Sequence, residues 1–108
     1  MAGVIEIRTY RLSPSSGPEF QRLFVEESLP MLERFGGVEV VAFGASLDDA
    51  DSYYLIRAYA SVAERQRSQD AFYGSDEWKE GPREAVLALI ESHHSVVLPA
   101  DSLVPHVR

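Results

Sequence analysis

Apolar and polar side chains alternate most clearly near the start of the chain, in the segment Val4–Leu12. Its β-branched and aromatic residues favour a strand, and successive side chains of a strand point to opposite faces. The two faces differ in character, with Ile5, Ile7 and Thr9 on one and Glu6, Arg8 and Tyr10 on the other. We expect the first face to pack against helices, which leaves the second face open.

A helical pattern follows over Glu19–Phe35, where apolar residues recur every three or four positions. Pro30 lies within this pattern and removes a hydrogen bond to the carbonyl of Glu26, so we expect a kink or a break there. Gly36 and Gly37 are typical of a helix C-terminus. Two segments rich in β-branched and aromatic residues then predict strands on either side of an acidic loop: Val38–Ala45 and Tyr53–Ala60.

From Tyr53 on, the chain repeats the order of strand, helix and strand. Ser61 with Glu64 matches a capping box and opens a mostly polar helix that we expect to stop at Gly74. Ser75 starts a short helix, and Pro82–Glu91 forms another. His93–Leu98 is the fourth predicted strand, and we assign residues 1–99 to one domain and residues 100–108 to a C-terminal tail.

The order β-α-β-β-α-β indicates an α+β, ferredoxin-like split βαβ fold. Right-handed crossovers give a four-stranded antiparallel sheet with strand order 4-1-3-2 and helices on one face. The first and third strands are then central neighbours. On the third strand we place Tyr53, Leu55, Arg57 and Tyr59 on the open face, since Arg57 cannot be buried without a partner. The second strand adds either Val41 and Phe43 or Val40 and Ala42 to that face.

So many aromatic and apolar residues on one open face would leave a large apolar patch, which monomeric soluble proteins rarely expose. We therefore expect a homodimer in which two sheets meet face to face and close a barrel. The alternative is a monomer whose tyrosines lie against water.

Composition narrows the possible functions. The 108 residues carry a net charge of -7, which argues against non-specific nucleic-acid binding. The chain has no cysteine, so disulfides and thiolate chemistry are excluded. No apolar run approaches the length of a membrane span and no signal peptide is visible, so we expect a cytoplasmic protein that does not bind membranes.

Arg8 and Arg57 lie on the two central strands and are candidates for binding a carboxylate or enolate inside the barrel. The alternative is that Glu6 neutralises both arginines and only fixes the sheet register. Tyr10 and Tyr59 are candidates for donating hydrogen bonds to a ligand, or for packing at the dimer interface.

Three further residues complete the candidate site. Phe43 and Trp78 are candidates for lining the cavity, although a tryptophan between two helix breakers also commonly anchors a loop on the core. His93 and His94 face opposite sides of the last strand, and His93 reaches the barrel if Val96 and Leu98 face the helices. That histidine is the plausible general base. We expect no metal site, since no second His or carboxylate lies at ligand spacing, and we expect no cofactor.

Three stretches together resemble the NIPSNAP family, and the resemblance extends from Val4 to about Pro99. They are Ile-Glu-Ile-Arg-Thr-Tyr-Arg-Leu at 5–12, Leu-Pro-Met-Leu-Glu-Arg-Phe-Gly-Gly at 29–37, and Tyr-Tyr-Leu-Ile-Arg-Ala-Tyr-Ala-Ser at 53–61. The Glu-x-Arg-x-Tyr pattern of the first stretch is the most specific part. The last strand departs from the family in lacking an arginine near Pro99.

The resemblance implies a dimeric α/β barrel and leaves the biochemistry undefined, because this fold supports several chemistries. Related folds include the cofactor-free monooxygenases of antibiotic biosynthesis. Our first hypothesis is a barrel that binds a small aromatic or anionic molecule, as a cofactor-independent oxygenase or isomerase. The alternative is a non-catalytic homodimeric interaction protein whose sheet face serves only assembly.

Overall fold

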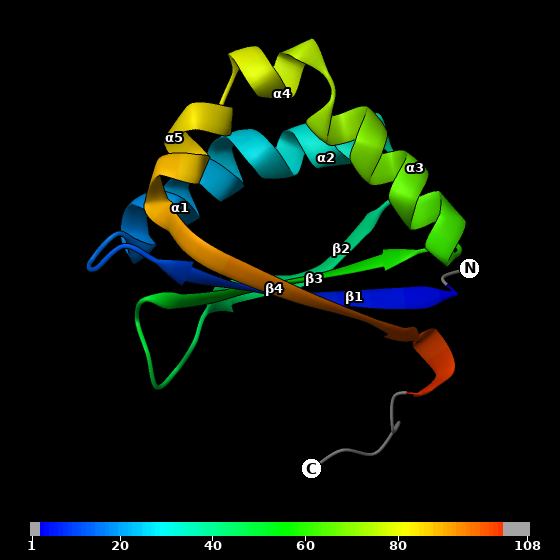
Figure 1. The fold of residues 1–108 in the computed structure, drawn as a ribbon, viewed down its shortest axis with the longest axis horizontal. Coiled ribbons are helices and arrows are strands. Elements are labelled where there is room, and N and C mark those ends of the chain that lie inside the picture. Colours follow the sequence, from blue (N-terminus) through cyan, green and yellow to red (C-terminus); the bar gives the residue numbers. More distant parts are fainter. Residues whose placement is uncertain (1–2, 103–108) are drawn as a thin grey trace.

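The computed structural model describes residues 3–102. They form a single antiparallel sheet covered by helices, shown in Figure 1. The elements in chain order are β1 (Val4–Leu12), α1 (Gly17–Leu23), the π-helical turn η1 (Phe24–Ser28), α2 (Leu29–Phe35), β2 (Glu39–Ala45), β3 (Ser52–Tyr59), α3 (Val62–Tyr73), α4 (Asp76–Glu80), α5 (Arg83–Leu89), β4 (Ile90–Pro99) and the 3₁₀ turn η2 (Ala100–Ser102).

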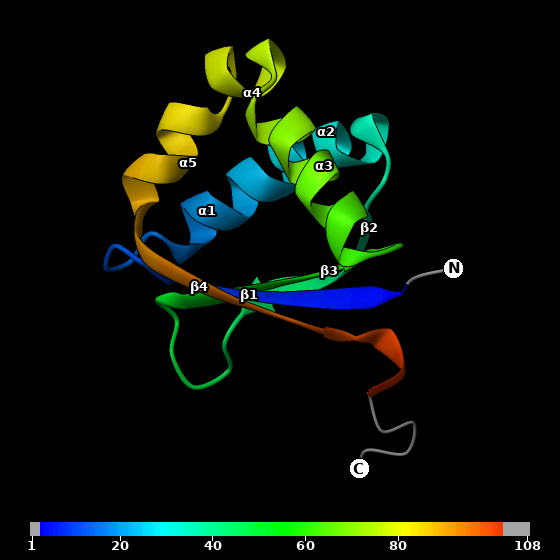
Figure 2. The same ribbon diagram turned by 45° about the vertical axis from the view of Figure 1, so that its right-hand side comes forward.

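The strand order is β2-β3-β1-β4 with every neighbouring pair antiparallel, which confirms the predicted order read from the opposite edge. All the α-helices lie on one face of the sheet, as the two views in Figures 1 and 2 show. The central strands β1 and β3 pair so that Glu6 lies opposite Arg57 and Tyr10 lies opposite Tyr53. The α+β, ferredoxin-like prediction is therefore confirmed.

Pro30 does not break its helix. It lies in the first turn of α2, and the turn before it, η1, is π-helical: the backbone N–H of Leu29 bonds to the carbonyl of Phe24, five residues earlier. The wider turn shifts the hydrogen-bond register directly before the residue that cannot donate. The helix thus continues through Pro30 and keeps Phe24 and Ser28 buried.

The predicted helix ends are present where the sequence indicates them. The Ser61 hydroxyl accepts a hydrogen bond from the backbone N–H of Glu64 at 3.0 Å and begins α3. The Ser75 hydroxyl accepts one from Trp78 N–H at 3.2 Å and begins α4. At the end of α2, Gly36 and Gly37 have φ values of 72° and 74°, a left-handed conformation that favours glycine.

The predicted assignment of the two sheet faces is wrong. Glu6, Tyr53, Leu55, Arg57 and Tyr59 are all buried, and they face the helices rather than the open side. Tyr53 packs edge-on against Phe20 of α1 with ring centroids 4.8 Å apart. The prediction assumed that Arg57 would be unpaired in the core, whereas Glu6 and α3 supply its partners.

Strand β2 follows neither of the two predicted alternatives, which placed Val41 and Phe43, or Val40 and Ala42, on the open face. A bulge lies between Val40 and Ala42, so that Val40 pairs with Arg57 while Phe43 pairs with Leu55. Both Val40 and Phe43 therefore share the helix-covered face. The extra residue that a bulge inserts is what breaks the simple alternation.

The open face of the sheet carries the residues expected to pack on helices. Ile7, Thr9, Tyr54 and Ile56 alternate with the buried residues of β1 and β3 and are not fully covered. Val96, which pairs with Ile7, is 57% exposed.

Within residues 3–102, no helix is long and apolar enough to span a membrane.

Candidate functional site

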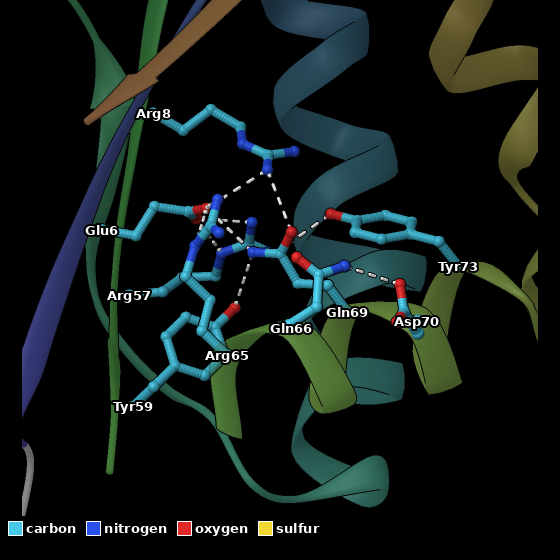
Figure 3. Close-up of polar contacts among 9 residues, drawn as sticks. All are labelled: Glu6, Arg8, Arg57, Tyr59, Arg65, Gln66, Gln69, Asp70 and Tyr73. Carbon is cyan, nitrogen blue, oxygen red and sulfur yellow. Dashed lines mark hydrogen bonds and ion pairs between the residues drawn. The ribbon is translucent and has the colours of Figure 1, made fainter. Parts of the chain in front are cut away.

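The carboxylate of Glu6 is the centre of a polar cluster between the sheet and α3, shown in Figure 3. Glu6 and Arg57 are both 0% exposed. Oε1 of Glu6 accepts hydrogen bonds from Arg57 Nε at 2.8 Å and from Arg57 Nη2 at 2.6 Å. Two ionised groups can be buried together in this way because each supplies the hydrogen bonds that the other loses from water.

Helix α3 supplies the partners of the second carboxylate oxygen. Oε2 of Glu6 accepts bonds from Arg65 Nε at 2.9 Å and Nη2 at 2.6 Å, and from Gln69 Nε2 at 2.8 Å. Arg8 Nη2 lies 3.2 Å from the same oxygen. Residues four apart lie on one side of a helix, so Arg65, Gln69 and Tyr73 all point from α3 toward the sheet.

These contacts determine the ionisation of Glu6. Burial alone raises the pKa of its carboxyl group, but the charges of Arg57 and Arg8 and the hydrogen bonds from Gln69 and Arg57 outweigh burial and lower the pKa to about 2. Glu6 is therefore an anion at any physiological pH. A carboxylate held in this state is a poor proton acceptor, so Glu6 is not a general base.

The cluster has more positive than negative charge. The guanidiniums of Arg8, Arg57 and Arg65 all bond to the single carboxylate of Glu6. Among residues 3–102, no other acidic side chain forms an ion pair with any of the three. Two positive charges are thus left in excess in a largely buried region of a chain whose net charge is -7.

Arg8 has a buried guanidinium nitrogen with capacity left for a ligand. Its side chain is 13% exposed, and its Nε is buried and forms no hydrogen bond within the described part of the chain. Burial lowers the pKa of Arg8, but the hydroxyls of Tyr10 and Tyr73 and the carboxylate of Glu6 raise it above its ordinary value. Arg8 therefore stays charged beside two tyrosines.

A small cavity of about 30 Å³ lies next to this cluster. Most of its lining is aromatic or aliphatic and comes from both the sheet and the helices: Tyr10, Phe20, Phe24, Ser28, Leu32, Leu55, Phe72, Tyr73, Trp78 and Val86. Tyr73 joins the cavity to the cluster, since this residue lines the cavity and its hydroxyl accepts a hydrogen bond from Arg57 Nη1 at 3.1 Å.

The structure brings most of the predicted site residues together, but on the helix side of the sheet. Glu6, Arg8, Arg57 and Tyr59 belong to the polar cluster, where Gln69 Nε2 lies 3.2 Å from the Tyr59 hydroxyl. Tyr10 and Trp78 line the cavity. Trp78 is 6% exposed and packs on Phe72 and Tyr73, so it is part of the core as well.

Two predicted residues lie elsewhere. Phe43 packs on Phe24, with ring centroids 4.8 Å apart, at the edge of the core. His93 pairs with Tyr10 across β1 and β4 and so lies on the helix side, while His94, Val96 and Leu98 lie on the open face. The prediction that His93 faces the barrel depended on Val96 and Leu98 facing the helices, so that placement is wrong; the His93 ring is exposed and does not line the cavity.

The predicted site lacks Arg65, Gln69 and Tyr73, because the polar pattern of α3 indicates a surface helix. A signal was present in their spacing, since polar residues at intervals of four form a continuous stripe on a helix. A stripe of one arginine, one glutamine and one tyrosine beside a strand with Glu6 is the pattern that identifies the cluster.

Solved structures of similar proteins share the fold over nearly the whole chain. A NIPSNAP domain protein from Burkholderia xenovorans is 21% identical, and the match covers 95% of this chain and 99% of that one with a TM-score of 0.80. A NIPSNAP family protein of unknown function from Agrobacterium tumefaciens is 21% identical, with 91% and 87% covered and a TM-score of 0.81.

SnoaB, a cofactor-independent oxygenase from Streptomyces nogalater, is 15% identical, with 98% of this chain and 100% of SnoaB covered and a TM-score of 0.73. None of the curated proteins compared with the chain matches it. The family model described as NIPSNAP matches residues 5–103, which confirms the resemblance seen in the strand with Glu6, Arg8 and Tyr10. The chain belongs to the NIPSNAP family.

Proposed function

We propose that this protein binds a small organic anion with an aromatic or otherwise apolar body in the space between its sheet and its helices. The observation that supports this is an excess of two positive charges in a cluster that is joined, through Tyr73, to an aromatic-lined cavity. Ligand sites commonly combine an apolar lining with a few polar groups that fix orientation. Arg8, with its free Nε, is the contact for the anionic group.

A ring-sized ligand needs more room than the cavity has, because about 30 Å³ accommodates roughly one water molecule. The wall that can yield is α4, a helix of five residues that carries Trp78. It lies between Gly74 and Gly81, and only short non-helical segments separate it from α3 and α5. Binding therefore involves a displacement of Trp78 from the cavity.

We propose that the reaction is a cofactor-independent oxygenation or isomerisation of the bound anion. The similarity to SnoaB, described as a cofactor-independent oxygenase, is one support. The other is chemical: guanidiniums and tyrosine hydroxyls fixed in a dry site stabilise negative charge that develops on a substrate.

Trp78 provides the test, because it is the only tryptophan in the sequence and lines the cavity. Benzoate should quench its fluorescence in a saturable way, and benzamide, which has nearly the same shape without the charge, should bind at least tenfold more weakly. Arg8→Gln should weaken benzoate binding at least tenfold. The matched control Arg22→Gln, at an exposed arginine of α1, should leave it unchanged.

If benzoate and benzamide bind alike, or if Arg8→Gln binds benzoate as tightly as the unaltered protein, the anion site is wrong. A direct assay of oxygen uptake with anionic phenols and 1,3-diketones tests the reaction class. Binding without any turnover would favour the non-catalytic alternative.

We also propose that the protein is a homodimer assembled through the open face of the sheet. The support is the apolar character of that face, where Val96 is 57% exposed and Ile7, Tyr54 and Ile56 are partly exposed. Sheet faces of this kind are commonly covered in soluble proteins. The predicted interface also contains Tyr53, Leu55 and Tyr59, but these residues face the helices instead.

Sedimentation equilibrium tests this assembly. The unaltered protein should sediment as a dimer at micromolar concentration, and Val96→Asp should shift it toward the monomer. Glu91→Gln, at an exposed position of the same strand, is the control and should stay dimeric. A monomeric unaltered protein would rule out the assembly and leave the anion site to be judged by its own test.

A further inference from the structure

The hydroxyl of Tyr73 has a donor position that the polar cluster does not use. A phenolic hydroxyl has one donor and two acceptor positions. Its oxygen accepts a hydrogen bond from Arg57 Nη1 at 3.1 Å, and among residues 3–102 no hydrogen bond donated by this hydroxyl is found. Because Tyr73 lines the cavity, an acceptor on a bound ligand is the partner that would satisfy it.

Most of the polar groups around this hydroxyl are hydrogen-bond donors. Arg8 and Arg57 have no acceptor atoms, and Nε of Arg8 is buried with its hydrogen unused. The one carboxylate nearby, Glu6, already accepts bonds from four side chains. A ligand oxygen placed between Arg8 and Tyr73 therefore meets two donors, while the acceptors found next to Arg8, Oε2 of Glu6 and Oε1 of Gln69, are already bonded to Arg8 Nη2.

The ionisable groups that face this space come from several elements: Glu6, Arg8 and Tyr10 from β1, Arg57 and Tyr59 from β3, and Arg65 and Tyr73 from α3. The cavity lining contributed by α1, η1, α2, α4 and α5 is uncharged. On β4, the exposed His93 ring lies 6.3 Å from Tyr10. The net charge of these groups at neutral pH is positive, which favours the ionised form of an acidic ligand.

We propose that the site takes a weakly acidic phenol or enol and holds it as the phenolate or enolate, with Tyr73 donating a hydrogen bond to the ligand oxygen beside Arg8. This inference rests on the proposed function and names the class of its substrate. The O–H bond of the ligand breaks on binding and its proton passes to solvent water. Glu6 does not take the proton, because its carboxylate is saturated with stronger donors.

4-Nitrophenol is the probe, since its phenolate absorbs visible light and its neutral form does not. Absorbance titrations from pH 5 to 9, with protein in excess, should show that bound 4-nitrophenol ionises at least one pH unit lower than free 4-nitrophenol. That shift corresponds to a preference of about tenfold for the phenolate. An unchanged or raised ionisation pH for the bound ligand would overturn the proposal.

Tyr73→Phe removes only the hydroxyl. We expect it to reduce the preference for the phenolate at least threefold, while Tyr54→Phe, on the other face of the sheet, leaves the preference unchanged. A Tyr73→Phe protein that keeps the full preference would remove Tyr73 from the site. Because the main titration uses the unaltered protein, the proposal is tested even if Tyr73→Phe does not fold.

Benzoate binding separates this inference from the proposed function. If benzoate binds and the ionisation of bound 4-nitrophenol is unshifted, the anion site stands and the phenolate inference fails. If neither ligand binds, the proposed function fails, and this inference fails with it.

Discussion

Glu6 and Arg57 lie directly opposite each other on β1 and β3, and both are fully excluded from solvent. The Arg57 Nη2 to Glu6 Oε1 distance is 2.6 Å. A buried ion pair adds little net stability compared with apolar residues of the same size, but the loss of one partner strands the other charge in the core. The pair therefore fixes how β1, β3 and α3 fit together.

Replacing Glu6 by glutamine tests that dependence. Glu6→Gln leaves Arg57 without a counter-ion in the core, so the free energy of unfolding should fall by about 3–5 kcal/mol. Guanidinium chloride unfolding followed by Trp78 fluorescence measures it. Glu19→Gln is the control, since Glu19 pairs with Arg22 on the exposed surface of α1, and such pairs contribute less than about 1 kcal/mol. Equal effects of the two substitutions would contradict the central role of Glu6.

Glu6 also predicts how stability depends on pH. Its pKa is about 2 in the folded protein, against an ordinary value of 4.5. A carboxyl group with a lowered pKa stabilises the fold above its unfolded pKa, and that stabilisation is lost as the pH falls. We expect a loss of about 3 kcal/mol between pH 4.5 and pH 2 from this one group.

Urea unfolding at a series of pH values should show this loss. Glu6→Gln lacks the titrating group, so its stability should fall less steeply over the same interval. Parallel pH profiles for the two proteins would show that other carboxylates account for the acid sensitivity.

The strands and their order were predictable because each element carries a strong local signal. Val4–Leu12 alternates, Ser61 begins a helix three residues before Glu64, and Gly36 ends one. Right-handed crossover rules then leave one arrangement of the strands. Neither step needs knowledge of tertiary contacts.

The face of the sheet that carries the site was not predictable by the same means. Both faces of β1 and β3 contain apolar residues, so the alternation does not say which is covered. The decision rested on Arg57, and burial of Arg57 depends on Glu6 across the sheet and on Tyr73 at the end of α3. The sheet face that Arg57 occupies is therefore decided by partners that only the tertiary fold brings together.

Helix α3 depends on its N-cap residue Ser61, and removing the capping hydroxyl should lower the stability of the protein measurably. Ser61→Ala removes the hydroxyl that accepts the Glu64 N–H at 3.0 Å, so unfolding free energy should fall by about 1 kcal/mol. Urea unfolding measures the change. Ser68→Ala, in the middle of the same helix, should change stability by no more than a few tenths of a kcal/mol, and in the stabilising direction. Ser61→Asp should restore most of the loss, because aspartate caps equally well.

Removing the Trp78 side chain should enlarge the cavity that Tyr10 and Tyr73 also line. Trp78→Ala deletes a buried indole that packs on Phe72 and Tyr73, so the protein should lose about 3–5 kcal/mol of stability. A ligand that fills the new space stabilises the folded state in proportion to its affinity. Thermal unfolding with added ligand therefore reports binding without any tryptophan signal.

The chemistry of the cavity predicts which ligand fills it best. In Trp78→Ala, 4-nitrophenol at pH 8 should raise the unfolding temperature more than nitrobenzene, which has the same ring without the acidic oxygen. Leu23→Ala is the control, because Leu23 is buried in the core but does not line this cavity. Leu23 belongs to a cluster of buried apolar and aromatic residues, so nitrobenzene should stabilise that variant at least as well as the phenolate. A preference for nitrobenzene in both variants would show that the guanidiniums of the cluster do not reach the cavity, and the anion site would lose its structural basis.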